Sequence, residues 1–141
     1  MTEDDPFNLQ RFVEAQAPVY ERVLSELRAG KKKSHWIWFV FPQIAGLGHS
    51  TMAEKYAIRS LDEAKAYLDH AVLGARLREC TELVLNVEGK TAVQIFDYPD
   101  DLKFRSSMTL FAHAAPDSSI FREAIEKYFA GAFDKVTVRA L

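Results

Sequence analysis

Residues 73–87 read LGARLRECTELVLNV, and their apolar side chains recur at the spacing of an α-helix. The inward positions step by four, three, four and three residues: Leu73, Leu77, Cys80, Val84 and Val87. Such a series places one apolar stripe along a single helix face. Cys80 lies on this stripe, so we expect it to fill the core rather than to act as a nucleophile, which would need a base beside it. The stretch predicts the longest amphipathic helix of the chain, over 72–87.

Helical patterns continue on both sides of this stretch and predict further helices over 18–29, 62–69, 101–114 and 120–130. Ser60-Leu61-Asp62-Glu63 reads as a capping box at the start of the second of these. Connections are short, and no repeat or interdomain linker interrupts the chain. The predicted fold class is therefore all-α: a compact helical bundle forming a single domain over 1–141, with a buried aromatic segment and with residues 1–6 flexible.

The aromatic segment is residues 36–41, WIWFVF, which propensity alone would make a strand. A strand needs a partner, and only VLNV (84–87) and KVTV (135–138) are candidates. A continuous apolar run cannot be told from a buried helix by pattern alone. Because helices are predicted on every side, we favour a short buried helix, with a strand as the alternative.

Composition excludes several classes of function. The 141 residues are 48% hydrophobic and carry a net charge of -2, which argues against general nucleic-acid binding and against a membrane-surface protein. Lys31-Lys32-Lys33 is the local exception, and we expect these cations to remain solvated just past a helix end. No apolar run approaches the ~20 residues that span a bilayer, and the acidic N-terminus is unlike a signal sequence. A cytoplasmic monomer is expected.

The stretch PQIAGLGHS, residues 42–50, has the composition of a pocket rim. A proline ends the aromatic run, and two glycines let the backbone turn. The first polar side chains then follow directly after the apolar aromatic run. The candidate ligand-binding residues are Trp36 in the preceding aromatic run and, within this stretch, Gln43, Gly46, Gly48, His49 and Ser50. The spacing matches neither the phosphate-binding P-loop nor the dinucleotide fingerprint.

A second candidate segment is DDLKFRSSMTLF, residues 100–111. A lysine, an arginine and two hydroxyls within five residues can hold a phosphate or a carboxylate, which makes Lys103, Arg105, Ser106 and Ser107 candidate ligands. The alternative is a solvated helix face with an ion pair between Asp101 and Arg105. We predict that this helix and the 42–50 turn meet around one cleft.

Few residues offer catalytic or metal chemistry. Glu54 follows the glycine turn and could act as a general base if burial raised its pKa, although such a glutamate is more often an ordinary first-turn residue. The four histidines show no helical pairing, so no metal site is expected, and no cofactor is indicated.

Three phrases carry a resemblance to a known family: HWIWFVFPQIAGLGHSTMAEKYAI (35–58), DEAKAYLDHAVLGARLREC (62–80) and DDLKFRSSMTLF (100–111). Together they resemble the bacterial domain-of-unknown-function family 1810, sometimes labelled calpastatin-like, from Phe7 to about Leu141. The family often has His-Pro where this chain has His70-Ala71. The resemblance implies a compact, mainly α-helical fold and supplies no activity; nothing in the chain resembles an inhibitor built from repeats.

A more distant likeness joins STMAEKYAI (50–58) and the later IF…D segment to the YbiA-like (NADAR) group of ADP-ribose-linked hydrolases. That likeness implies a catalytic role for Glu54, stacking by Trp36 or Trp38, and phosphate contacts from Lys103 and Arg105. The glycine-rich tryptophan motif of the group is absent here.

Two classes of function remain open at this point. One is the binding or hydrolysis of a small anionic metabolite, such as a nucleotide, an ADP-ribose-like compound or a sugar phosphate. The other is a non-catalytic protein-interaction or structural module. Paired polar groups in one cleft would favour the first, and an exposed apolar patch would favour the second.

Overall fold

The structure is a computed structural model that describes residues 4–141, and these residues form ten helices and no strand. The helices are α1 (Gln10–Gln16), α2 (Tyr20–Arg28), α3 (Ile37–Val40), α4 (Thr51–Lys55), α5 (Leu61–Asp69), α6 (Leu73–Leu85), α7 (Ala92–Phe96), α8 (Asp100–Ala114), α9 (Ser119–Phe129) and α10 (Lys135–Ala140). The predicted all-α fold class is confirmed, and each of the five helices predicted from periodicity is present within two residues of its expected bounds.

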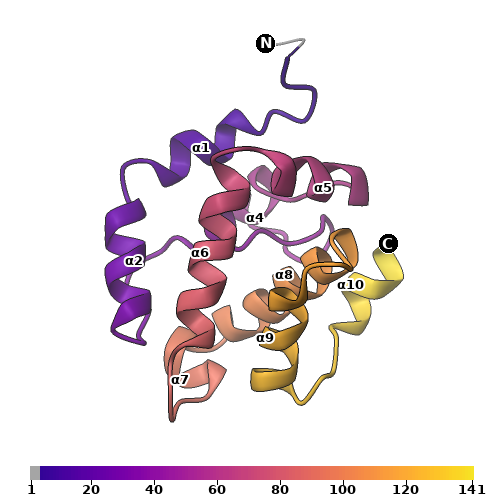
Figure 1. The fold of residues 1–141 in the computed structure, drawn as a ribbon. Helices are drawn as coiled ribbons and strands as arrows, with labels where there is room; N and C mark the ends of the chain where they lie inside the picture. Colours follow the sequence, from indigo (N-terminus) through magenta and orange to yellow (C-terminus); the bar gives the residue numbers. More distant parts are fainter. Residues whose placement is uncertain (1–3) are drawn as a thin grey trace.

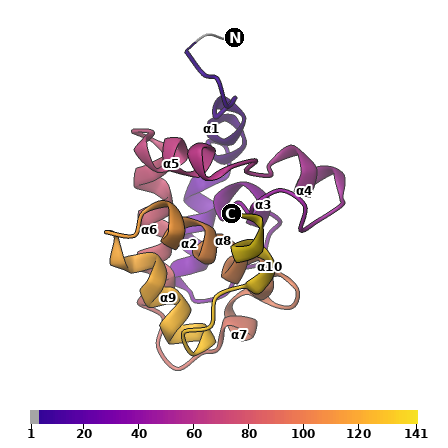
Figure 2. The same ribbon diagram turned by 90° about the vertical axis from the view of Figure 1, so that its right-hand side faces the viewer.

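Helix α8 is the centre of the molecule, with the other helices arranged around it (Figures 1 and 2). It packs against α3, α5, α7, α9 and α10. Its aromatic side chain Phe104 is fully buried and stacks on Phe96 of α7, with ring centroids 4.7 Å apart. The hydroxyls of Ser106 and Thr109 donate to carbonyls one turn back, so these polar residues are buried without losing their hydrogen bonds.

Helix α6 confirms the amphipathic stripe from which the fold was predicted. Leu73, Leu77, Cys80 and Val84 are all buried, and α6 packs against α2, α5 and α9. Figure 1 shows α6 running along the molecule with α2 beside it. Burial raises the pKa of the Cys80 thiol to about 12, which leaves the thiolate nearly absent at neutral pH and agrees with a packing role.

The aromatic segment is a short buried helix, α3, so the strand alternative is wrong. The carboxylate of Glu26 fixes the chain that leads into it, accepting hydrogen bonds from the Lys33 and Ser34 N–H groups and from the indole N–H of Trp36. At the other end, the Phe41 ring meets Phe104 edge-on at 5.0 Å. Of the two candidate partner stretches, 84–87 spans the C-terminal end of α6 and 135–138 lies in α10.

Lys32 departs from the solvated state expected for the lysine run, whereas Lys33 is exposed as expected. Lys32 is buried, and its ammonium lies 2.7 Å from a carboxylate oxygen of Asp100 and 5.2 Å from the centroid of the Trp36 ring. Lys31 pairs with Asp97 at 2.7 Å. The expectation considered only the end of α2, whereas the run also packs against the α7–α8 connection.

Helices α1, α7 and α10 were not predicted: α1 and α10 present no clear apolar period, and α7 has only five residues. Asp5 takes up the N–H groups of Leu9 and Gln10 at the start of α1, and Asp134 caps α10. Residues 1–6 were expected to be flexible. Residues 1–3 of this range lie outside the described residues. Within residues 4–141, no helix is long and apolar enough to cross a membrane.

Candidate functional site

The 42–50 turn and the start of α8 line one pocket of about 440 Å³. Helix α10, which covers the near side of α8 in Figure 2, supplies a third wall. The lining comprises Trp38, Gln43, Leu47, Gly48, His49, Ser50, Ala53, Pro99, Leu102, Lys103, Ser106, Asp134 and Val136. The volume lies within the range of about 300–1,000 Å³ in which small-molecule sites fall.

The loop that carries the pocket turn is closed at its base. The Ile58 N–H donates to the Gln43 carbonyl at 2.8 Å, and the Ala45 N–H donates to the Ile58 carbonyl at 2.7 Å. Within the loop, a Cβ atom on Gly48 would lie 2.8 Å from the Cβ of Ala53, closer than such atoms approach, so glycine permits this contact between turn and helix. The backbone around the pocket is therefore held by hydrogen bonds and by close packing.

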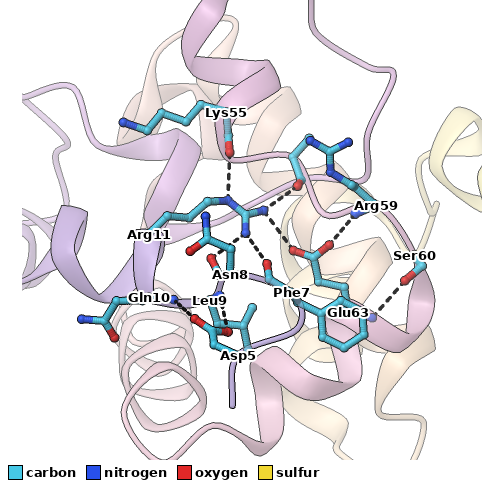
Figure 3. A network of polar contacts seen from close by, with 11 residues as sticks. Asp5, Phe7, Asn8, Leu9, Gln10, Arg11, Lys55, Arg59, Ser60 and Glu63 are labelled. Atoms are coloured by element: carbon cyan, nitrogen blue, oxygen red, sulfur yellow. Dashed lines mark hydrogen bonds and ion pairs between the residues drawn. The ribbon is translucent and has the colours of Figure 1, made fainter. Parts of the chain in front are cut away.

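Arg11 holds the far end of α4 (Figure 3). Its guanidinium donates to the carbonyls of Lys55 and Ala57 and to the Glu63 carboxylate, at 2.9, 2.9 and 3.0 Å. The Glu63 side chain is 2% exposed, and its second oxygen accepts the Arg59 N–H. The half-buried Arg11 guanidinium, paired with the buried Glu63 carboxylate, also donates to backbone carbonyls, so the C-terminal end of α4 is held in place.

Sequence reasoning missed this anchor. The capping box is half formed: the Ser60 hydroxyl accepts the Glu63 N–H as expected, but the Glu63 carboxylate turns to Arg59 and Arg11 instead of Ser60. No spacing rule connects Arg11 to residues more than forty positions later in the chain.

Trp38 and Lys103 meet at the pocket. The Lys103 ammonium lies 5.2 Å from the centroid of the Trp38 ring, within the distance of a cation–π contact. The same ammonium lies 3.4 Å from one oxygen of Asp100, whose other oxygen pairs with Lys32. One carboxylate thus serves two lysines, and the cluster keeps a net positive charge.

Six of the predicted ligand-binding residues line this pocket: Gln43, Gly48, His49, Ser50, Lys103 and Ser106. Ser50 also caps α4, accepting the Ala53 N–H at 3.1 Å. Ser106 donates its hydroxyl to the Leu102 carbonyl, so its hydrogen atom is already used. Gln43, His49 and Lys103 contribute the side chains that are most available to a ligand.

The other predicted residues lie elsewhere. Trp36 is 1% exposed and donates its indole N–H to Glu26, so it belongs to the core and not to the pocket wall. Gly46, with φ of 98°, shapes the turn outside the pocket lining. Glu54 is exposed on α4 and is not among the lining residues.

Arg105 and Ser107 also face away from the pocket. The Arg105 guanidinium donates to the Ala132 carbonyl at 2.8 Å and lies over the Phe129 ring, tying α8 to the chain before α10. It forms no ion pair with Asp101 among residues 4–141. Ser107 is fully buried, and its hydroxyl has no partner there. A helix that is buried on most sides brings only some of its polar residues to any one pocket.

Asp134 and Val136 were missed because they come from α10. Asp134 caps that helix, and its Oδ2 accepts from the backbone N–H and the hydroxyl of Thr137. The Asp134 N–H donates to the Thr109 hydroxyl at 3.0 Å, which joins α10 to α8. The sequence signal for this wall was Asp134 three residues before Thr137, the spacing of an N-cap, and this signal is weak where no periodic apolar pattern follows.

Comparisons with known proteins agree with the fold and give no activity. The conserved hypothetical protein Rv1873 from Mycobacterium tuberculosis, known from a crystal structure, is 56% identical to the chain with a TM-score of 0.96. The match covers 97% of this chain and 98% of that one. No curated protein matches the chain significantly. These findings lend no support to the likeness with the YbiA-like group.

The family predicted from the three phrases is confirmed by a match over residues 6–141 to the family described as "Protein of unknown function (DUF1810)". Since this match spans nearly the whole sequence, the chain belongs to the DUF1810 family.

Proposed function

We propose that the pocket between the 42–50 turn and α8 binds a small phosphorylated metabolite, of the nucleotide, ADP-ribose-like or sugar-phosphate class. The observation that carries the proposal is the meeting of Trp38 and Lys103 at the pocket, with the ammonium 5.2 Å from the ring centroid. An aromatic side chain and a cation side by side match a ligand with a planar or apolar body and an anionic group.

Lys103 is suited to exchange partners. Its contact with Asp100 is 3.4 Å, longer than the roughly 2.7–2.9 Å of a charge-assisted hydrogen bond, and its side chain is 26% exposed. A phosphate oxygen would offer a shorter contact, while Asp100 would keep its 2.7 Å pair with Lys32. Binding would then replace a loose ion pair without leaving the Asp100 carboxylate unpaired.

The geometry favours binding over hydrolysis. Glu54, the predicted general base, is exposed outside the pocket lining. Asp134 is the carboxylate that lines the pocket, and its Oδ2 is engaged in capping α10. A general base must reach the proton it abstracts, and neither group is placed for that task.

A second candidate is a protein-interaction surface, favoured by exposed apolar side chains at the same place. Leu102 and Val136 line the pocket and are 43% and 53% exposed. Exposed apolar groups that gather at one site mark ligand or protein contacts alike. If this reading holds, Val136→Asp will abolish an association seen by light scattering, and phosphorylated ligands will not bind.

The test is isothermal titration calorimetry with adenosine 5′-monophosphate and ribose 5-phosphate. Lys103→Met should weaken binding by about tenfold or more, because a hydrogen bond to a charged group contributes about 1.5–3 kcal/mol. Lys65→Met, which removes an exposed lysine from α5, is the matched control and should bind as the parent does. The proposal fails if the parent binds neither ligand at about 10 mM, or if the two variants bind equally well.

A further inference from the structure

A second pocket, of about 300 Å³, adjoins the first and shares Trp38 and Pro99 with it. We infer that this second pocket holds a second anionic group of the same ligand, so that the preferred ligand is a bisphosphorylated metabolite lying across Trp38. The inference rests on the proposed function of the first pocket and adds the class of ligand. Among the residues that line only the second pocket are Lys33 and His35, and the inference assigns them a role in binding.

Continuity of the two pockets is the first argument. Each volume lies near the lower part of the range for small-molecule sites, about 300–1,000 Å³. Because Trp38 and Pro99 form part of both linings, a ligand against Trp38 in the first pocket borders the second. A ligand with one anionic group would leave the second pocket filled only by water.

Charge is the second argument. Asp97 is paired with Lys31, and Asp100 is shared between Lys32 and Lys103, so both carboxylates of the second pocket are already matched. No carboxylate of residues 4–141 pairs with Lys33, which is exposed at the pocket. The second pocket therefore carries an unmatched ammonium, with the exposed His35 imidazole beside it in the lining.

The backbone that presents these side chains is fixed before any ligand arrives. The Lys32 N–H donates to the Ile95 carbonyl at 2.8 Å, and the Lys33 N–H donates to the Glu26 carboxylate at 2.8 Å. The Ser34 hydroxyl donates to the other Glu26 oxygen at 2.6 Å. Since the backbone of this segment is already ordered, only the Lys33 side chain would lose conformational freedom on binding. The entropic cost of binding would therefore be small.

The experiment compares adenosine 5′-monophosphate with adenosine 3′,5′-bisphosphate, which differ by one phosphate group, by titration calorimetry on the full chain. The parent should bind the bisphosphate about tenfold more tightly. Lys33→Met should reduce this preference to near one while leaving the affinity for the monophosphate within about twofold. Lys65→Met controls for the loss of one surface charge, and Lys33 keeps its backbone hydrogen bond in the variant, so folding is preserved.

The outcomes separate this inference from the proposed function. If the parent binds both ligands equally, the inference is wrong and the proposed function stands. A preference that survives in Lys33→Met also overturns the inference, because the second phosphate then binds elsewhere. If neither ligand binds, the proposed function itself fails and takes the inference with it.

Discussion

The ammonium of Lys103 and the ring of Trp38 are 5.2 Å apart, although one residue belongs to the central helix and the other to the aromatic segment. Trp36, two residues before Trp38, points instead to Glu26 and is buried. Trp36 therefore belongs to the core, whereas Trp38, two residues later, forms part of the pocket wall.

This division predicts opposite effects for the same substitution. Trp36→Ala should lower the free energy of unfolding by about 3–5 kcal/mol, because it empties a core site and removes a donor from the buried Glu26 carboxylate. Trp38→Ala should cost far less stability and should weaken ligand binding. Urea unfolding and calorimetry on both variants check this. Equal losses of stability would contradict the assignment.

Glu26 should make the fold sensitive to acid. Burial would raise the pKa of its carboxyl, but hydrogen bonds from Ser34, Lys33 and Trp36 outweigh burial and lower the pKa from 4.5 to about 2. A lowered pKa in the folded state means that this contribution to stability is complete above about pH 5 and is lost as the pH falls toward 2. The difference corresponds to about 3 kcal/mol.

Denaturant unfolding at several pH values between 5 and 2 tests this dependence. Glu26→Gln should be less stable at pH 7 and should lose less stability on acidification than the parent. Identical slopes for the two proteins would show that another carboxyl group controls acid unfolding.

Arg105→Ala should reduce stability and leave ligand affinity nearly unchanged. The guanidinium donates to the Ala132 carbonyl and lies over Phe129, so its loss should cost about 1–2 kcal/mol. Arg105→Lys should recover only part of this, because an ammonium cannot reproduce the planar contacts. A variant that melts with the parent but binds ligand poorly would restore the binding role that the sequence indicated.

Ser107→Ala should be neutral or stabilising. The hydroxyl is fully buried without a hydrogen-bond partner among the described residues, and alanine favours the helix. Thermal melts of Ser107→Ala and Ser106→Ala make a matched pair, since the Ser106 hydroxyl does have an acceptor. A clear loss of stability in Ser107→Ala would mean that its hydroxyl has a partner after all.

Periodicity predicted the outer helices well, because a helix with one buried face has apolar residues at regular three- and four-residue spacings. Helix α6 is the clear example, with Leu73 and Val84 at opposite ends of one stripe. Helix α8 is buried on most sides, so its polar residues could not be sorted by pattern: Lys103 and Ser106 line the pocket, whereas Arg105 and Ser107 do not.

The site was predictable in outline only. The composition of the 42–50 turn and of the start of α8 predicted that the two segments meet, because each combines polar side chains with apolar neighbours. Trp36 and Trp38 looked alike in sequence, and their difference depends on Glu26, ten positions before Trp36. The wall from α10 was not predicted, because Asp134 caps and Val136 belongs to a short helix that has no clear apolar period.

The most direct test of the central claim is an NMR titration that follows the indole N–H signals of the two tryptophans, assigned with Trp38→Phe. On addition of adenosine 5′-monophosphate to about 10 mM, where even a millimolar complex is largely formed, the Trp38 signal should move together with the backbone signals of His49, Ser50 and Lys103. The Trp36 signal should stay in place, because that indole is buried and bound to Glu26. A Trp38 signal that does not move, or shifts confined to the separate pocket lined by Glu82 and Lys127, would contradict the account.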